Sequence, residues 1–537
     1  MSRLPSFACC ITMAVALAVP ELTFARNPVD PLSPPAVAAA QAPSGVWYEI
    51  FVRSFYDTNG DGIGDLNGVT AKLDYLKSLG VSGIWLMPIN PSPSYHGYDV
   101  TDYYGINPQY GTLADFRHLV TEAHQRGIKV IIDMVINHSG NENRWFKAAL
   151  DPNSPYHDWY TWANQYTDLA SDSVTGSPAW HATGKPSASG QPAPAQYYLG
   201  IFAPTMPDLN YDNPAVRAEM IKVGQFWLKQ GVDGFRLDAA RHIYENFPWE
   251  VDDPAAQAKN FAWWNAYHRG LDTVNPHTYL VGEVTRDYAT ELAPWLKPLD
   301  AVFNFPLAKQ LIAAAASERN LGLGPTLDRT YAAYEAVGGP TIKDAPFLSN
   351  HDQERVMSQL DDNLQHMRTA AVMLLTLPGE PYIYYGEELG TQGRKPDPEL
   401  RQPMRWQRSS KARGETTWET GNPANGAAVS VETEQADPHS LLHLYTRLIH
   451  WRSEIPALRD GGFRAYPEAS DHLVAWERTA PHGTVLVVHN LSGQAQTMAL
   501  DVPGEPHFIR VLKQTGPGTA IHAGMLSVPP YTSVVLQ

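Results

Sequence analysis

Residues 231–242, GVDGFRLDAARH, read as a short buried β-strand that ends in charged residues. Arg236 and Asp238 stand two positions apart, so strand geometry directs both side chains to the same face. Burying two charges costs several kcal/mol each unless they pair or take part in chemistry. The segment therefore predicts a strand whose open end carries an ion pair or a functional group.

Seven other runs of β-branched and aromatic residues have the length of strands, and helical patterns lie between them. An example of a helical pattern is residues 113–127, LADFRHLVTEAHQRG, where apolar residues recur at helical spacing and Gly127 ends the helix. Alternation of this kind is typical of an α/β fold with a parallel sheet, and eight units predict a closed (β/α)8 TIM barrel. The eight runs are 45–55, 81–89, 128–138, 232–242, 278–284, 300–307, 344–352 and 381–390.

Two parts of the chain do not follow this alternation. Residues 139–211 are rich in Pro, Ser, Tyr and Trp, and they exceed the length of one helix, which predicts a small domain inserted after the third strand. From residue 461 onward, strand-length alternations such as HLVAWERT are separated by Gly/Pro turns. We therefore expect the barrel to occupy 45–138 and 212–460, and an all-β sandwich domain to occupy 461–537.

The N-terminus has the pattern of a secretory signal peptide. Arg3 precedes an apolar run, and TFA at residues 23–25 offers a small-residue cleavage site, with an alternative cut after residue 42. We expect a signal peptide over 1–25, a linker over 26–44, and export of a bacterial protein to the periplasm or the medium. Both cysteines, Cys9 and Cys10, lie in the signal peptide, so the mature chain contains none.

The formal charge of −16 over 537 residues excludes a nucleic acid partner, which would require a basic patch. No segment reaches the roughly 18 uninterrupted apolar residues that spanning a bilayer needs. The composition is 43% hydrophobic and 18% charged, which is typical of a globular protein. We expect a monomer that acts on a neutral partner.

Polar residues end several of the predicted strands, and in a barrel these ends meet at one face. Three carboxylates from three strands at one mouth match what glycoside hydrolysis requires, namely a paired acid and nucleophile. The polar residues that end the predicted strands are Asp133, Asn137 and His138 on the third strand, Arg236 and Asp238 on the fourth, Glu283 on the fifth, and His351 and Asp352 on the seventh.

These segments resemble the four sequence regions of the α-amylase family of glycoside hydrolases. DMVINH at Asp133, GFRLDAARH at Gly234, GEV at Gly282 and FLSNHD at Phe347 occur in the family's order, and MPDLN at Met206 lies in the predicted inserted domain. The resemblance covers the chain from about residue 45 to its end. The resemblance implies the (β/α)8 barrel, the inserted domain and the C-terminal all-β sandwich that the strand and helix patterns also predict.

By this resemblance Asp238 is the nucleophile, Glu283 is the general acid and base, and Asp352 stabilises the distorted sugar. We expect Arg236 to lower the pKa of Asp238, and burial to raise that of Glu283. Taken singly, Arg236 and Asp238 are more often a structural ion pair, and Asp352 a helix cap. The joint pattern favours catalysis, and the complete set of carboxylates argues against a non-catalytic barrel.

The resemblance also assigns residues that contact substrate. Tyr98, in SYHGYDVTDY, corresponds to a tyrosine that stacks on the sugar, and His138 and His351 correspond to donors to its hydroxyls. Asp99 and Arg401 match a pair that closes the non-reducing end in the glucosidase branch and favours exo action, although a structural salt bridge is equally consistent.

Residues 57–65, DTNGDGIGD, have the oxygen ligands and glycines of a calcium loop. Position twelve is Gly68 rather than Glu, so this is not an EF-hand. Ca2+, or Mg2+, would be bound by Asp57, Asn59, Asp61, Asp65 and the carbonyl of Ile63; the alternative is a turn without metal. A second calcium, by resemblance, would use Asn137, Asp208 and the carbonyl of His242, but glucosidases share the first two without an ion.

Two cues bear on specificity. Arg241 and His242 resemble the basic residue and histidine that follow the nucleophile in true α-amylases, which places His242 among the substrate-binding candidates. MPDLN is intermediate between the amylase and the oligo-1,6-glucosidase or neopullulanase versions. We therefore expect an α-amylase that cuts α-1,4 bonds in starch and maltodextrins. The alternative is a maltooligosaccharide-active α-glucosidase, cyclomaltodextrinase or transglycosylase.

Overall fold

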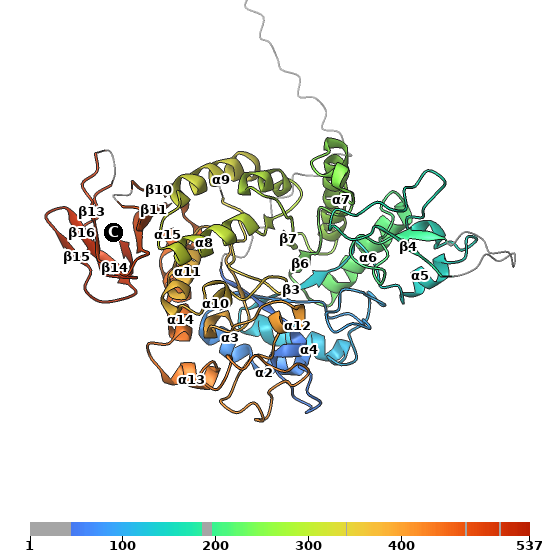
Figure 1. Ribbon diagram of the computed structural model, residues 1–537, viewed down its shortest axis with the longest axis horizontal. Helices are drawn as coiled ribbons and strands as arrows, with labels where there is room; N and C mark the ends of the chain where they lie inside the picture. The colour runs from blue at the N-terminus through green and yellow to red at the C-terminus, as the bar shows by residue number, and fades with distance from the viewer. Residues whose placement is uncertain (1–44, 185–195, 340, 468–469, 504–505) are drawn as a thin grey trace, which may run out of the picture. The chain divides into compact units, whose positions relative to one another are not determined.

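The structure is a computed structural model that describes residues 45–184, 196–339, 341–467, 470–503 and 506–537 (Figure 1). The predicted signal peptide and linker lie outside these residues. No helix in the described ranges combines the length and the apolar character that crossing a membrane requires.

A curled parallel sheet forms the centre of the fold, and its strands follow one another in the order β8-β7-β6-β3-β2-β1-β9. The run at 344–352 closes the ring through two parallel bridges, Phe303 with Ala345 and Phe347 with Tyr382. This eighth position is short because Pro346 has no N–H to donate to a neighbouring strand. The predicted (β/α)8 barrel is confirmed. Its strands are β1 (Trp47–Ile50), β2 (Gly83–Leu86), β3 (Lys129–Met134), β6 (Gly234–Leu237), β7 (Tyr279–Gly282), β8 (Ala301–Val302) and β9 (Tyr382–Tyr384).

Helices alternate with these strands. The predicted helix at 113–127 is α4 (Leu113–Gln125): Thr112 and Asp115 form a capping box at its start, and Gly127 follows its end with φ +72°. The longer helices are α6 (Pro214–Lys229), α7 (Pro254–Asp272), α8 (Phe305–Ser317), α9 (Leu323–Gly338), α11 (Leu364–Thr376) and α14 (Leu441–Glu454). The shorter ones are α1 (Val52–Phe55), α2 (Leu66–Ala71), α3 (Leu73–Leu79), α10 (Val356–Gln359), α12 (Asp397–Leu400), α13 (Val431–Ala436) and α15 (Pro456–Asp460).

The inside of the barrel is filled by aromatic side chains. Trp47 stacks on Tyr279 and Tyr382 with ring centroids 5.4 and 5.8 Å apart. Because successive strand residues point to opposite faces, Glu49 lies on the same inner face as Trp47. Asp133 is in register with Arg236 on the neighbouring strand, one layer above the aromatic packing. The barrel thus places charged residues inside, at the carboxyl ends of its strands.

The segment after β3 and the C-terminal region complete the architecture. Residues 139–211 contain α5 (Arg144–Ala149), the 3-10 turn η1 (His157–Trp159), and an antiparallel pair, β4 (Trp180–Ala182) with β5 (Tyr197–Leu199). The C-terminal region is all-β, as predicted, with a five-stranded sheet, β10-β11-β12-β17-β14, and a three-stranded sheet, β13-β16-β15. Its strands are β10 (Gly462–Ala465), β11 (Leu473–Ala480), β12 (Gly483–Asn490), β13 (Gln496–Ala499), β14 (Val511–Gln514), β15 (Ala520–His522), β16 (Met525–Val528) and β17 (Ser533–Leu536).

Candidate active site

One guanidinium group organises the carboxylates at the mouth of the barrel. Nη1 of Arg236 lies 2.9 Å from Oδ1 of Asp133 and 2.6 Å from Oδ1 of Asp238, and Nη2 lies 2.8 Å from Oε2 of Glu283. The Arg236 side chain is only 1% exposed. The paired charges that the strand pattern predicts are therefore present, and Arg236 serves three carboxylates rather than one.

Backbone bonds between the ends of β6 and β7 hold Asp238 and Glu283 together. The N–H of Glu283 donates to the carbonyl of Leu237 at 3.0 Å, and the N–H of Ala239 donates to Oε2 of Glu283 at 3.0 Å. Ala239 has φ +47°, a conformation that is strained for a residue with a Cβ. The backbone thus turns sharply just after Asp238 and presents its amide to the second carboxylate.

Burial governs the proton affinity of this pair. It raises the pKa of Glu283 above its ordinary value, against the opposing charge of Arg236, as expected. Burial also raises the pKa of Asp238, and Arg236 offsets this only in part. Arg236 lowers the pKa of Asp238, as expected, but the cost of removing the carboxylate from water is larger, so the pKa of Asp238 still lies above its ordinary value.

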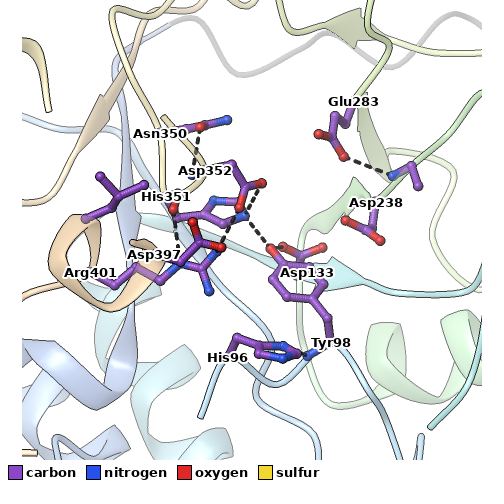
Figure 2. Close-up of polar contacts among 12 residues, drawn as sticks. His96, Tyr98, Asp133, Asp238, Glu283, Asn350, His351, Asp352, Asp397 and Arg401 are labelled. Carbon is purple, nitrogen blue, oxygen red and sulfur yellow. Dashed lines mark hydrogen bonds and ion pairs between the residues drawn. The ribbon is translucent and has the colours of Figure 1, made fainter. Parts of the chain in front are cut away.

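Asp352 lies across the site from Asp238 and Glu283, next to His351 and Arg401 (Figure 2). Its carboxylate contacts Nε2 of His351 at 3.0 Å and Nη2 of Arg401 at 2.7 Å. Its side chain is 45% exposed, so the carboxylate borders the open site. Partial burial opposes the charge, but His351 and Arg401 hold the pKa of Asp352 well below its usual range.

His351 is held by two carboxylates and a tyrosine. Its Nδ1 lies 2.6 Å from Oε1 of Glu49, and its Nε2 lies 2.6 Å from the hydroxyl of Tyr98, whose ring stacks on the imidazole at 5.6 Å. Burial lowers the pKa of His351, but Asp352 and Glu49 outweigh it and raise the pKa to about 9. The imidazole is therefore charged at neutral pH.

Of the remaining predicted substrate residues, Tyr98 contacts the acidic site, whereas His138 and His242 bond to backbone carbonyls. Tyr98 reaches the site, and its hydroxyl donates to Oδ2 of Asp133 at 3.1 Å. His138 is 2% exposed, its Nε2 lies 3.1 Å from the carbonyl of Tyr98, and burial lowers its pKa to about 4. His138 thus supports the loop that carries Tyr98. Nδ1 of His242 lies 2.7 Å from the carbonyl of Glu245.

The pair expected between Asp99 and Arg401 does not form in the described part of the chain. Oδ1 of Asp99 accepts hydrogen bonds from the hydroxyls of Ser92 and Ser94, which satisfy it locally. Arg401 instead pairs with Asp352, and Asp397 lies 3.7 Å from the same guanidinium nitrogen. The two serines, five and seven residues away in sequence, therefore satisfy the carboxylate that the resemblance assigned to Arg401.

The loop at 57–65 is built by its own hydrogen bonds. Asp57 accepts from the amides of Asn59, Gly60 and Gly62 at 3.0, 2.6 and 2.8 Å. Asp61 accepts from the amide of Ile63 at 2.8 Å, and Asp65 caps α2 through the amide of Gly68 at 2.7 Å. No three His, Cys, Asp or Glu side chains gather as a metal site within the described ranges. Calcium at this loop stays a prediction.

At the second predicted metal site, the carboxylate of Asp208 likewise accepts hydrogen bonds from protein groups. Asn137 directs its amide nitrogen at Oδ1 of Asp208, 3.2 Å away, and the amide of Ile201 donates to Oδ2 at 3.2 Å. Burial raises the pKa of Asp208 to about 8. A cation here would require the side-chain oxygen of Asn137 to be turned toward the ion, and the second calcium stays a prediction.

Of the residues that matter to the site, Glu49 is absent from the prediction, and Asp133 is predicted only as a polar residue at a strand end, with no role. Glu49 fixes His351 across 302 positions of sequence, and Asp133 shares Arg236 with Asp238. A signal for both was available, because each is an acid inside a strand that otherwise consists of buried residues. Because side chains alternate between the two faces of a strand, both acids are expected to point into the barrel.

A pair of carboxylates at the mouth of a barrel is the arrangement that retaining and inverting glycoside hydrolases use. Residues 49–461 match the sequence family described as alpha amylase, catalytic domain, and residues 473–535 match the family described as alpha-amylase SusG C-terminal domain. The chain belongs to the α-amylase family of glycoside hydrolases.

Relatives within the family differ in the activity their names record. Alpha-amylase 3 of Dictyoglomus thermophilum is 40% identical over 84% of this chain and 85% of its own length. An oligo-1,6-glucosidase of Parageobacillus thermoglucosidasius is 31% identical over 85% of this chain and 91% of its own. The crystal structure of an alpha-amylase from H. orenii has a TM-score of 0.81 and 43% identity, over 92% of this chain and 99% of that one. The family is therefore established, and the bond that is cleaved needs a separate argument.

Proposed function

We propose that the protein is an α-amylase that hydrolyses α-1,4-glucosidic bonds in starch and maltodextrins with retention of configuration. The observation that carries this proposal is the single guanidinium of Arg236 that contacts both Asp238 and Glu283. Asp238 attacks the anomeric carbon while Glu283 gives a proton to the leaving oxygen. Water then displaces the glycosyl-enzyme ester, and Glu283 takes the proton from that water.

The spacing of the two carboxylates supports retention. Retaining enzymes keep the two groups about 5–5.5 Å apart, whereas inverting enzymes separate them by about 6.5–9.5 Å to admit a water. Asp238 and Glu283 bind two nitrogens of the same guanidinium at 2.6 and 2.8 Å. Such a bridge favours the shorter spacing.

The proton affinities of the carboxylates support these roles. The raised pKa of Glu283 favours the protonated acid that departure of the leaving group requires. The pKa of Asp352 is held well below its usual range, so this group stays ionised opposite the positive charge that develops on the sugar. Asp238 must be ionised to attack, and Arg236 opposes the effect of burial on it.

The contacts of Arg401 support endo action as part of this proposal. An exo enzyme of the glucosidase branch would use Asp99 and Arg401 to close the non-reducing end. Here Asp99 is bonded to Ser92 and Ser94, and Arg401 to Asp352. Asp99 and Arg401 therefore do not pair with each other in the described residues, which favours an α-amylase over the oligo-1,6-glucosidase activity that the name of one relative gives.

Product analysis tests the proposal. Amylose digested with the purified enzyme and sampled early should give mixed maltooligosaccharides by anion-exchange chromatography. Glucose as the sole early product would indicate an α-glucosidase instead, and products longer than a maltooligosaccharide substrate would indicate a transglycosylase. Failure to act on any α-1,4-glucan would refute the proposal.

We further propose that a calcium ion at residues 57–65 stabilises the loop and takes no part in the chemistry. The support is the set of oxygen ligands on Asp57, Asn59, Asp61 and Asp65, together with the carbonyl of Ile63. We also propose export to the periplasm or the medium, from the apolar leader with its small-residue cleavage site, and a monomer in solution. N-terminal sequencing of the secreted protein and sedimentation analysis test these two points.

A further inference from the structure

A ladder of aromatic rings joins the inserted segment to the loop that follows β6. The rings of Phe247 and Trp249 are parallel, 4.6 Å apart and inclined by 6°, and Trp180 of β4 stacks on Phe247 at 6.3 Å and 28°. The inner rings of this ladder, Trp180 and Phe247, line a cavity of about 350 Å³. Trp249, at the outer end, is 65% exposed and is the most exposed tryptophan of the described ranges.

The loop that carries Trp249 is firmly built. Trp249 lies in η2 (Pro248–Glu250), and the side chain of Glu250 accepts hydrogen bonds from the amides of Asn246 and Phe247 at 2.8 and 3.0 Å. The N-terminal part of this loop is tied to the next one, because Arg286, which follows β7, contacts Glu245 at 3.1 Å and lies 3.7 Å from Asp252. These bonds hold the backbone of the loop, and the ring of Trp249 stacks on Phe247 without a ligand.

The location of the ladder relates it to the carboxylates. The loop of Trp249 leaves the carboxyl end of β6 directly after Asp238, and the loop of Arg286 leaves the carboxyl end of β7 directly after Glu283. In a (β/α)8 barrel these ends form the catalytic face. Trp249 thus belongs to the same rim as the proposed nucleophile and acid, eleven residues along the chain from Asp238.

An exposed indole held rigid by a second ring is suited to a flat, weakly polar ligand surface. Single exposed apolar side chains are common, but Trp249 continues a stack of three aromatic rings, and contiguous aromatic surface marks binding sites. Phe247 covers one face of Trp249, so the other face is available. The faces of a glucosyl ring carry C–H groups that pack against an aromatic plane, while its hydroxyls hydrogen-bond to polar groups or water around that plane.

We propose that Trp249 is a platform for a glucosyl unit of an α-glucan chain that extends beyond the bond being cleaved. This inference rests on the proposed function, and it adds that the enzyme discriminates by chain length. A long chain reaches both the carboxylates and Trp249, whereas a short oligosaccharide held at the carboxylates does not. The second contact tethers the long chain and raises its effective concentration at the site.

Binding without turnover tests the platform directly. In the Glu283→Gln background, native gels that contain amylopectin should retard the protein, and Trp249→Ala should reduce the retardation. Trp249→Phe keeps a ring in place and should restore most of it. Ile509→Ala, which removes an 81% exposed apolar side chain of the C-terminal region, is the matched control and should migrate like the parent. Thermal melting of each variant reports on folding.

Kinetics of the active enzyme provide the second test. Trp249→Ala should lower the ratio of kcat/KM on amylose to kcat/KM on maltotriose by about threefold to tenfold, the range expected for loss of one aromatic contact. If the parent hydrolyses both glucans and Trp249→Ala leaves this ratio and the retardation unchanged, the platform is refuted while the proposed function stands. If Trp249→Ala changes only the sedimentation of the protein, the ring is a contact between two copies of the chain, and the platform is likewise refuted.

Discussion

Replacement of Arg236 tests the reasoning about the carboxylates most fully. Its guanidinium contacts Asp133, Asp238 and Glu283 at 2.6–2.9 Å while almost wholly buried. Removing one partner of a buried ion pair costs about 3–5 kcal/mol. Shared among three carboxylates this is roughly 1–1.7 kcal/mol each, which corresponds to a rise of about one in the pKa of each group.

The direction of the effect on activity follows from the role of Asp238. Attack requires the ionised form, so activity is lost as the pH falls through the pKa of Asp238. Arg236 opposes the rise that burial causes, and Arg236→Ala therefore raises this pKa further. The acidic limb of the plot of kcat/KM against pH should move to higher pH by about one unit. Loss of orientation should lower the plateau by at least about 10²-fold.

Two variants complete the experiment. Arg236→Lys keeps a charge but cannot bridge the carboxylates, so it should restore part of the acidic limb and little of the plateau. Arg452→Ala removes another guanidinium that is 1% exposed, bonded to the carbonyls of Leu377 and Gly379, and it should lower the melting temperature without moving the limb. An acidic limb that stays in place in Arg236→Ala would refute the electrostatic reasoning.

Three further predictions concern single groups. Glu283→Gln removes the transferable proton and keeps the shape of the side chain, so kcat on starch should fall at least about 10²-fold, and full activity would exclude Glu283 as the acid. His351 has its pKa raised from 6.5 to about 9, so its contribution to the free energy of unfolding is complete below about pH 6.5 and is lost as the pH rises through about 9. Urea unfolding should therefore show this alkaline decline, and Glu49→Gln should make it shallower; an identical decline would show that Glu49 does not hold the imidazolium. Calcium at 100 times its dissociation constant should add about 2.7 kcal/mol to the free energy of unfolding of the parent and much less to that of Asp61→Asn. Melting temperatures that change with neither calcium nor chelator would refute the proposed calcium site.

Most of the fold was predictable because its signals are local. Each strand run can be recognised within ten or so residues, and the helix at 113–127 carries its own capping box and terminating glycine. The run at 344–352 shows the limit of such signals: it lies in the ring, but Pro346 reduces its pairing to two bridges. Local patterns thus predict which segments form the barrel better than how long each strand is.

The site was predictable in its carboxylates and less so in their partners. Arg236 and Asp238 share a face by strand geometry alone, and the structure brings them to 2.6 Å. The contact of His351 with Glu49 joins segments 302 positions apart, which no local pattern encodes. The pair expected between Asp99 and Arg401 is a long-range contact that does not form, because the hydroxyls of two nearby serines donate to Asp99 instead.

Identification of the residue that forms the glycosyl-enzyme tests the central claim most directly. A fluorinated glucosyl fluoride that forms this ester quickly and releases it slowly is incubated with the enzyme, and proteolytic peptides are analysed by mass spectrometry. The proposed mechanism predicts one additional fluoroglucosyl mass on the peptide that contains Asp238, and none in Asp238→Asn. A label on Glu283 or Asp352, or no label together with release of the β-anomer from an α-linked substrate, would contradict it.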